Sequence, residues 1–235
     1  MSAPLLETVG LEVFYGDFQA LFGVDMVIRE GETVAIIGAN GAGKSSFLNA
    51  VAGLNASKPE QIRYNGKNIG GMRAFDVVRE GIALVPEGRK LFPSLSVEEN
   101  LLIGLHGKSV SRGWDLESIY ELFPILKERR LQPSTTLSGG QQQQCAIGRG
   151  LMSNPQVLLC DEISLGLSPA VVKDVYAAIK EIKRRGTTVL IVEQDLTAAL
   201  AAADQVYCLM EGKVTLSGRP DELTRDQIQA AYFGV

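Results

Sequence analysis

Residues 38–45 read Gly38-Ala39-Asn40-Gly41-Ala42-Gly43-Lys44-Ser45, which fits the phosphate-loop pattern G-x-x-x-x-G-K-[ST] at every fixed position. The glycines let the backbone turn so tightly that successive N–H groups face the oxygens of a bound phosphate. Lys44 supplies a positive charge for the outer phosphates, and Ser45 supplies a hydroxyl for Mg²⁺. With Ser46 counted in the same segment, residues 38–46 are predicted to bind a nucleoside triphosphate together with magnesium.

The segments on either side of this loop have the pattern that a phosphate loop requires. Residues 33–37 form a continuous apolar run of strand length, and residues 46–52 read as a helix. A helix that begins near Gly43 adds the positive end of its dipole to the phosphate site. This strand–loop–helix order makes a glycine-rich surface turn a poor explanation of the motif.

Further apolar runs extend the strand pattern along the chain. Residues 82–85, 157–160 and 188–192 are continuous apolar runs, as expected for strands that are covered on both faces. Between the last two runs, Ser168 begins a predicted helix that Gly186 ends. This alternation predicts an α/β fold with a doubly wound, mostly parallel core sheet.

The two ends of the chain and its middle depart from this alternation. The patterns there predict two strands of an antiparallel N-terminal layer, a hairpin turn and a closing helix, at 11–14, 26–28, 210–213 and 221–231 respectively. Helical patterns broken by glycine and proline fill residues of about 87–152. We therefore expect a single domain over residues 1–235, with a helical subdomain at about 87–152 inserted in the core.

The composition is that of an ordinary globular protein without a bias towards polyanions. The chain has 235 residues, of which 46% are hydrophobic and 21% charged, with a formal net charge of −4 and a pI near 5.2. Such a chain has no long-range attraction to nucleic acid. Its densest basic run, at 183–185, stands where a predicted helix ends, and cations there complement the helix dipole. We therefore expect no nucleic-acid partner.

The residues available exclude several other chemistries. His106 is the only histidine, so a zinc site or a Ser/His/Asp triad would depend on one imidazole. Cys145, Cys160 and Cys208 lie far apart without metal-ligand spacing and are expected to be free thiols of a cytoplasmic protein. The first basic residue is Arg29, and no apolar run approaches the ~20 residues of a membrane span. We expect neither a signal peptide nor a transmembrane helix.

Two acidic residues, Asp161 and Glu162, follow the apolar run at 157–160. In an open α/β sheet, ligands bind at the carboxyl ends of the strands. Asp161 is a candidate to hold Mg²⁺, directly or through water, and Glu162 to act as the general base on the attacking water. Acidic residues after a strand also occur at helix starts. The preceding phosphate loop favours the metal and base roles.

Residues 137–141, Leu137-Ser138-Gly139-Gly140-Gln141, match the signature sequence of the ATP-binding cassette (ABC) ATPases and stand shortly before the acidic pair, as in that family. A Ser-Gly-Gly sequence can also be an ordinary helix N-cap, but here it occurs together with the phosphate loop and the acidic pair. The chain thus resembles an ABC ATPase over essentially its whole length. The resemblance implies the ABC type of P-loop NTPase fold, with a RecA-like core and a helical subdomain.

The resemblance also implies a site shared between two subunits. ATP would lie in a head-to-tail dimer between residues 38–46 of one subunit and residues 138–141 of the other, so that a monomer is catalytically incomplete. Tyr15 matches the aromatic residue that stacks on adenine in this family. Residues 164–167 match the loop through which the two ATPase subunits sense each other.

Two departures from the general family pattern point to one branch. Glu87 stands where most members carry glutamine, and Gln194 stands where most carry histidine. Both resemble the ATPase subunits of bacterial importers for branched-chain amino acids and for urea or short amides, which also share the style of residues 91–93 and 96–100. Either substitution alone is compatible with drift, but their coincidence favours this subgroup.

The departure at Gln194 changes the expected proton chemistry. A neutral amide can hydrogen-bond the γ-phosphate or the attacking water, but it cannot gain a proton near neutral pH. Proton handling therefore falls on Glu162, and we expect Glu162, Lys44 and Gln194 to be the catalytic residues.

The departure at Glu87 brings a carboxylate towards the γ-phosphate, which would repel it unless Mg²⁺ or Arg89 offsets the charge. Glu87 is therefore a candidate metal ligand beside Ser45 and Asp161. Because it stands at the subdomain junction, we also expect it to couple the nucleotide state to a membrane partner.

The resemblance implies an ATPase subunit that powers an importer from the cytoplasmic face of the membrane. Its implied partners are permease subunits, a second ABC ATPase subunit (a copy or a paralogue) and, indirectly, an extracytoplasmic solute-binding protein. The alternative is a stand-alone ABC ATPase in translation or DNA repair, but these usually carry duplicated cassettes, coiled-coil insertions or basic extensions. A GTPase would need an Asn-Lys-x-Asp motif, which this sequence lacks. The transported solute and the identity of the second ATPase subunit stay open at this point.

Overall fold

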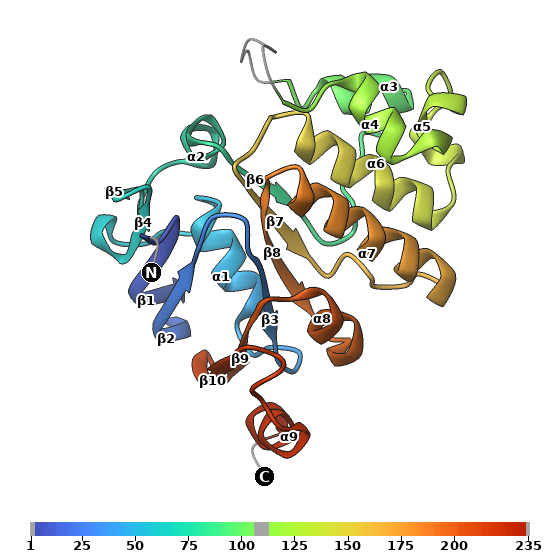
Figure 1. Ribbon diagram of the computed structural model, residues 1–235. Helices are drawn as coiled ribbons and strands as arrows, with labels where there is room; N and C mark the ends of the chain where they lie inside the picture. The colour runs from blue at the N-terminus through green and yellow to red at the C-terminus, as the bar shows by residue number, and fades with distance from the viewer. Residues whose placement is uncertain (1–2, 106–112, 234–235) are drawn as a thin grey trace.

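A six-stranded sheet forms the centre of the protein, which we describe from a computed structural model over residues 3–105 and 113–233 (Figure 1). Its strands are β3 (Thr33–Ile37), β6 (Ile82–Val85), β7 (Val157–Asp161), β8 (Thr188–Glu193), β9 (Gln205–Met210) and β10 (Lys213–Gly218). They run in the order β10-β9-β3-β8-β7-β6, and every neighbouring pair is parallel except β10 with β9. The predicted mostly parallel sheet is confirmed.

The register of the central strands brings three carboxyl ends together. Every residue of β3, β7 and β8 is buried, which is why their sequences read as continuous apolar runs. Ile37 of β3 lies opposite Glu193 of β8, and Asp161 of β7 lies opposite Val192 of β8. The loops that follow these strands therefore begin side by side.

A second, antiparallel sheet covers one face of the first. It contains β1 (Leu6–Tyr15), β2 (Phe18–Ile28), β4 (Ile62–Tyr64) and β5 (Lys67–Asn68), in the order β2-β1-β4-β5. Helix α1 (Lys44–Val51) buries Phe47 and Leu48 in a core that it shares with both sheets. The predicted N-terminal antiparallel layer is confirmed. Strands β4 and β5 were not expected, because two or three residues are too few to show a period.

Helices cover the other face of the central sheet. The large helices α6 (Gly139–Leu151) and α7 (Pro169–Arg184) pack there in one apolar core. Helices α3, α4, α5 and α6 come from the chain between β6 and β7, and they gather at one end of the molecule (Figure 1). The bounds of the remaining helices are α2 (Ala74–Glu80), α3 (Val97–Leu102), α4 (Leu116–Leu122), α5 (Pro124–Glu128), α8 (Leu196–Ala202) and α9 (Arg225–Phe233), with 3₁₀ turns at Pro59–Gln61 and Ser134–Thr136.

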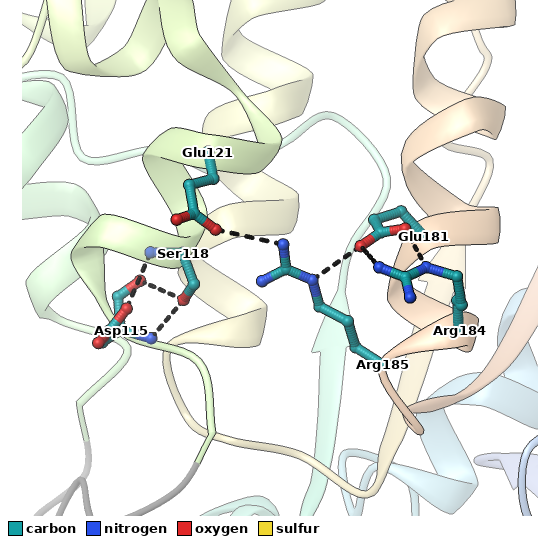
Figure 2. Close-up of polar contacts among 6 residues, drawn as sticks. All are labelled: Asp115, Ser118, Glu121, Glu181, Arg184 and Arg185. Carbon is teal, nitrogen blue, oxygen red and sulfur yellow. Dashed lines mark hydrogen bonds and ion pairs between the residues drawn. The ribbon is translucent and has the colours of Figure 1, made fainter.

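The basic run at the end of α7 lies in ion pairs within the chain. Arg184 and Arg185 each pair with Glu181, at N–O distances of 2.7 and 2.9 Å. Arg185 also reaches Glu121 on α4, at 3.3 Å, so that it lies between the two helices (Figure 2). Helix α4 is itself capped by Asp115, whose carboxylate accepts a hydrogen bond from the Ser118 N–H at 2.8 Å (Figure 2). Arg185 therefore joins the helical end of the molecule to the core.

The C-terminal segment confirms the predicted hairpin but shifts the predicted closing helix. Glu211 and Gly212 both have positive φ, at 49° and 74°, as a two-residue hairpin turn requires. Helix α9 begins at Arg225 rather than at Asp221, because Thr224 and Gln227 cap it reciprocally: each backbone N–H donates to the other side chain, at 2.8 and 3.2 Å. This Thr-x-x-Gln pattern was the missed start signal.

Three other expectations concern isolated features. Cys145, Cys160 and Cys208 are free, as expected, and all three are buried. Over 3–105 and 113–233, no helix combines the length and the apolarity that crossing a membrane requires. His106 lies outside the described residues.

Candidate nucleotide-binding and hydrolysis site

The phosphate loop joins β3 to α1 and depends on glycine for its shape. Gly43 is the N-cap of α1 and has a φ of 102°. Gly38 directly follows β3, and a Cβ there would lie 2.2 Å from the carbonyl oxygen of Leu209. A side chain would therefore push the loop away from β9. The loop can hold its backbone N–H groups at the end of the sheet only because these positions lack Cβ atoms.

Lys44 is folded back across this loop. Its side chain is 4% exposed, and its Nζ donates hydrogen bonds to the carbonyl oxygens of Gly38, at 2.8 Å, and Ala39, at 3.1 Å. Burial lowers the pKa of Lys44, while the negative charges of Glu162 and Asp161 oppose that shift. The ammonium group is thus positioned by the loop that it serves and faces the acidic end of β7.

Ser45 and Asp161 bring two oxygen ligands together from distant parts of the chain. The Ser45 hydroxyl donates to Oδ1 of Asp161 at 3.0 Å. Burial raises the pKa of Asp161 to about 6, and the Ser45 hydrogen bond opposes this rise. The pair fits Mg²⁺, which prefers oxygen ligands and is usually held by one or two protein groups plus substrate phosphates. The described residues contain no cluster of three or more His, Cys, Asp or Glu side chains that could hold a metal by itself.

Glu87 is exposed and lies just after the end of β6. Its charge is close enough to Asp161 to contribute to the raised pKa of that carboxyl. Among the ion pairs of the described residues, none joins Glu87 to Arg89. Arg89 instead donates a hydrogen bond to Gln142 of α6, at 3.2 Å. The suggested charge compensation of Glu87 by Arg89 is therefore not seen.

Glu162 and Gln194 are in direct contact. Gln194 Nε2 donates to Oε1 of Glu162 at 3.0 Å and also to Oδ1 of Asn40 in the phosphate loop. Lys44 Nζ lies 3.9 Å from the same Glu162 oxygen. The three expected catalytic side chains thus meet in one polar cluster, in which Gln194 is hydrogen-bonded to Glu162 and Lys44 is ion-paired with it.

A pocket of about 260 Å³ lies beside the phosphate loop, and Glu162 is part of its wall. Tyr15 lines the pocket with its ring half exposed, while its hydroxyl donates to Ser46 Oγ at 3.2 Å and accepts from Asn55 Nδ2 at 2.7 Å. The sequence analysis missed Phe18, which faces Tyr15 across the β1–β2 hairpin and lines the same pocket. Its place directly after the Gly16-Asp17 turn could have indicated it.

The signature residues lie elsewhere in this chain. Ser138 is the N-cap of α6, and Gln141 completes a capping box with an N–H to Ser138 Oγ distance of 3.4 Å. None of residues 138–141 lines the pocket beside the phosphate loop. The N-cap interpretation is therefore structurally correct, and within one chain the signature does not meet the phosphate loop.

The comparisons with known proteins agree with this geometry. The family model described as ABC transporter matches residues 21–164. The chain is 41% identical to the high-affinity branched-chain amino acid transport ATP-binding protein BraG of Pseudomonas aeruginosa, over 95% of this chain and 97% of that one. It is 32% identical to the probable branched-chain amino acid transport ATP-binding protein LivF of Archaeoglobus fulgidus, over 93% and 94% of the two chains.

Solved structures show the same fold. A nucleotide-free ATP-binding cassette from an ABC transporter superposes with a TM-score of 0.79 at 28% identity, covering 97% of this chain and 95% of that one. A structure of an ATP-binding subunit of an ABC transporter also has a TM-score of 0.79, at 29% identity, covering 94% and 92%. This chain therefore belongs to the ABC transporter family and is one of its ATP-binding, ATP-hydrolysing subunits.

Proposed function

We propose that this chain powers an importer for branched-chain amino acids or a related small polar solute such as urea or a short amide. The observation that carries the proposal is that Gln194 contacts Glu162 at the phosphate loop while Glu87 stands just after β6, because these two departures from the general family pattern together resemble the importer subgroup. The 41% identity to a branched-chain amino acid transport protein supports the same solute class.

In the proposed reaction, each side chain of the cluster has one task. Lys44 binds the outer phosphates of ATP, and Glu162 accepts the proton of the water that attacks the γ-phosphorus. Gln194 orients Glu162 and the water without taking up a proton itself. Ser45 and Asp161 would hold Mg²⁺, which when bound neutralises charge on the phosphate oxygens. The bond to the leaving ADP oxygen breaks as the new P–O bond forms.

The proposed active unit contains two ATPase subunits, since one chain holds only half of the site. A second subunit, either a copy or a paralogue, would present residues 138–141 to ATP bound at residues 38–46, with Tyr15 on the adenine. A second pocket, of about 380 Å³, is lined by Glu162 and residues 164–167. This shared lining supports the proposal that a partner subunit would contact both residues 164–167 and Glu162.

The movement of this pair would drive membrane permease subunits on the cytoplasmic face of the membrane, with a solute-binding protein on the other side. Glu87 is proposed to couple the nucleotide state to the permease. It is exposed just after β6, and its negative charge contributes to the raised pKa of Asp161. Its role as a metal ligand is a weaker proposal, since Asp161 and Ser45 already supply the converging oxygens.

Uptake in cells tests the proposal. The native copy is replaced by Glu162→Gln or Lys44→Ala, and uptake of two groups of labelled solutes is measured: the branched-chain amino acids, and urea with acetamide. Each variant should lower uptake of one of these groups by at least about a hundredfold. Glu60→Gln, an exposed carboxylate on the 3₁₀ turn at 59–61, is the matched control and should keep full uptake. Normal uptake of both solute classes in the Glu162→Gln strain would contradict the importer role and favour a stand-alone ATPase.

A further inference from the structure

The end of β8 holds the segment that follows β7 at three consecutive positions. The carbonyl oxygen of Val192 accepts a hydrogen bond from the Glu162 N–H at 3.0 Å. The carboxylate of Glu193 accepts one from the Ser164 N–H at 3.1 Å and one from the Ser164 hydroxyl at 2.7 Å. Gln194 donates to the Glu162 side chain. Two strands are thus tied together at the point where the proposed general base leaves the sheet.

Glu162 needs such support, because its backbone is strained. Its φ of 48° lies in the left-handed region that side-chain-bearing residues rarely adopt. Ile163, the next residue, is completely buried and cannot move without opening the core. The carbonyl of Glu162 also accepts a hydrogen bond from the Leu165 N–H, at 3.2 Å, which closes a turn around Ser164. Ser164, which Glu193 binds, lies inside this turn.

We infer that Glu193 is a positioning residue for hydrolysis: by binding both donors of Ser164, it keeps Glu162 in its left-handed conformation and its carboxylate against Gln194. The inference rests on the proposed role of Glu162 as general base. Glu193 itself does not line the pocket beside the phosphate loop. It acts through the loop and not on the nucleotide.

The burial of Glu193 makes its carboxylate dependent on the hydrogen bonds from Ser164. The residue is 2% exposed, and a buried carboxylate is costly unless donors surround it. Ser164 supplies two of these donors. A carboxylate at position 193 requires hydrogen-bond donors, which an apolar residue would not. The loop after β7 meets this requirement only in a conformation that directs the Ser164 N–H and O–H towards Glu193. This requirement couples the core to the conformation of Glu162.

The test uses the full chain with single and double substitutions. Ser164→Ala removes the hydroxyl bond on a half-exposed loop, where the fold tolerates it, and Ser164→Thr keeps that bond. Glu193→Gln weakens the bidentate contact without emptying the core. Ser168→Ala is the matched control, because Ser168 stands at the start of α7 and makes no side-chain cap hydrogen bond. The readouts are steady-state ATP hydrolysis, binding of the analogue AMP-PNP, and hydrogen exchange of the nucleotide-free chain.

Ser164→Ala and Glu193→Gln should each lower kcat by about tenfold or more, with KM and AMP-PNP affinity changed less than about twofold. In the nucleotide-free chain, the amides of Glu162 and Leu165 should exchange about tenfold faster while those of β8 keep their protection. The double variant should be no worse than the poorer single one, and Ser164→Thr should restore kcat.

Unchanged kcat and unchanged exchange in Ser164→Ala would overturn the inference, as would equal losses in Ser168→Ala. Faster exchange across β8 would also overturn it, because Glu193 would then be a general stabiliser of the core. Glu162→Gln separates this failure from failure of the proposed function. If Glu162→Gln still hydrolyses ATP, the general base is wrong; if it is inactive while Ser164→Ala is normal, only the positioning role is wrong.

Discussion

At the scale of single residues, the site brings three acidic side chains together beside one lysine. Asp161, Glu162 and Glu193 stand at neighbouring strand ends, with Lys44 as the buried cation beside them. Burial is the main reason that the pKa of Asp161 rises to about 6, and the charges of Glu162 and Glu87 add to the rise. The nucleotide-free chain therefore carries an electrostatic cost at the position where Mg²⁺ is proposed to bind.

This cost predicts a pH-dependent stability. The folded carboxyl of Asp161 holds its proton to about pH 6, whereas the unfolded one releases it near 3.8, so the free energy of unfolding should fall as pH rises through this window. Asp161→Asn should remove that part of the slope and stabilise the metal-free chain at pH 7 by about 1–3 kcal/mol. Urea unfolding from pH 4 to 7 without nucleotide or Mg²⁺ measures it. A less stable Asp161→Asn chain at pH 7 would contradict this account.

At the scale of elements, Arg185 links the end of α7 to α4 and to the residue Trp114 that precedes α4. Besides its two ion pairs (Figure 2), its guanidinium carbon lies 5.0 Å from the centre of the Trp114 ring. Trp114 is 5% exposed, and its indole N–H donates to Thr187 Oγ1 at 3.3 Å. The start of α4 is thus anchored on the segment between α7 and β8, with Arg185 covering the anchor.

Arg184 and Arg185 form a matched pair for a test, because both bind Glu181 but only Arg185 reaches α4. Arg185→Ala should lower the free energy of unfolding by about 1 kcal/mol, through the lost cation–π and interhelical contacts. Arg184→Ala should have a smaller effect. Hydrogen exchange locates the difference: residues 116–122 should lose protection in Arg185→Ala and keep it in Arg184→Ala. Equal effects of the two changes would mean that Arg185 does not join the helices.

At the scale of the whole molecule, the separation of the signature from the phosphate loop is the dominant fact. The loop lies at the end of β3. The signature lies at the start of α6, which belongs to the helical end of the molecule (Figure 1). Both segments are internally well ordered by glycine geometry and by the capping box. This separation supports the proposed second subunit, which would bring its own signature to the phosphate loop of the first.

Mixing two inactive variants tests for a shared site. Ser138→Asp keeps an N-cap for α6 but places a carboxylate where the proposed partner holds ATP, and Glu162→Gln lacks the proposed base. Each variant alone should be inactive. An equal mixture should recover about one quarter of normal activity, because half of the dimers are mixed and each mixed dimer has one intact site. Inactivity of the mixture, with the unmodified chain active, would contradict a site shared between two copies of this chain.

Local patterns in the sequence were enough for the central parallel strands and the motifs, but they gave only short parts of β1 and β2. The runs at 33–37 and 82–85 coincide with β3 and β6, because a strand buried on both faces must be apolar throughout. The glycines of the phosphate loop and the starts of α6 and α7 could be predicted from the sequence, because the interactions that define them join residues only a few positions apart. Very short strands and the start of α9 were missed, since their signals span too few positions.

The sequence by itself determined that this chain has a phosphate loop, an acidic pair, an ABC signature, and a glutamine at position 194 where most family members carry histidine. Only the tertiary structure decided which side chains are in contact. Ser45 is hydrogen-bonded to Asp161, 116 residues away in the sequence, and Glu193 to Ser164, 29 residues away. These contacts follow from the register in which β3, β7 and β8 pack side by side. Register is set by long-range burial and hydrogen bonding between strands, and no short stretch of sequence encodes it.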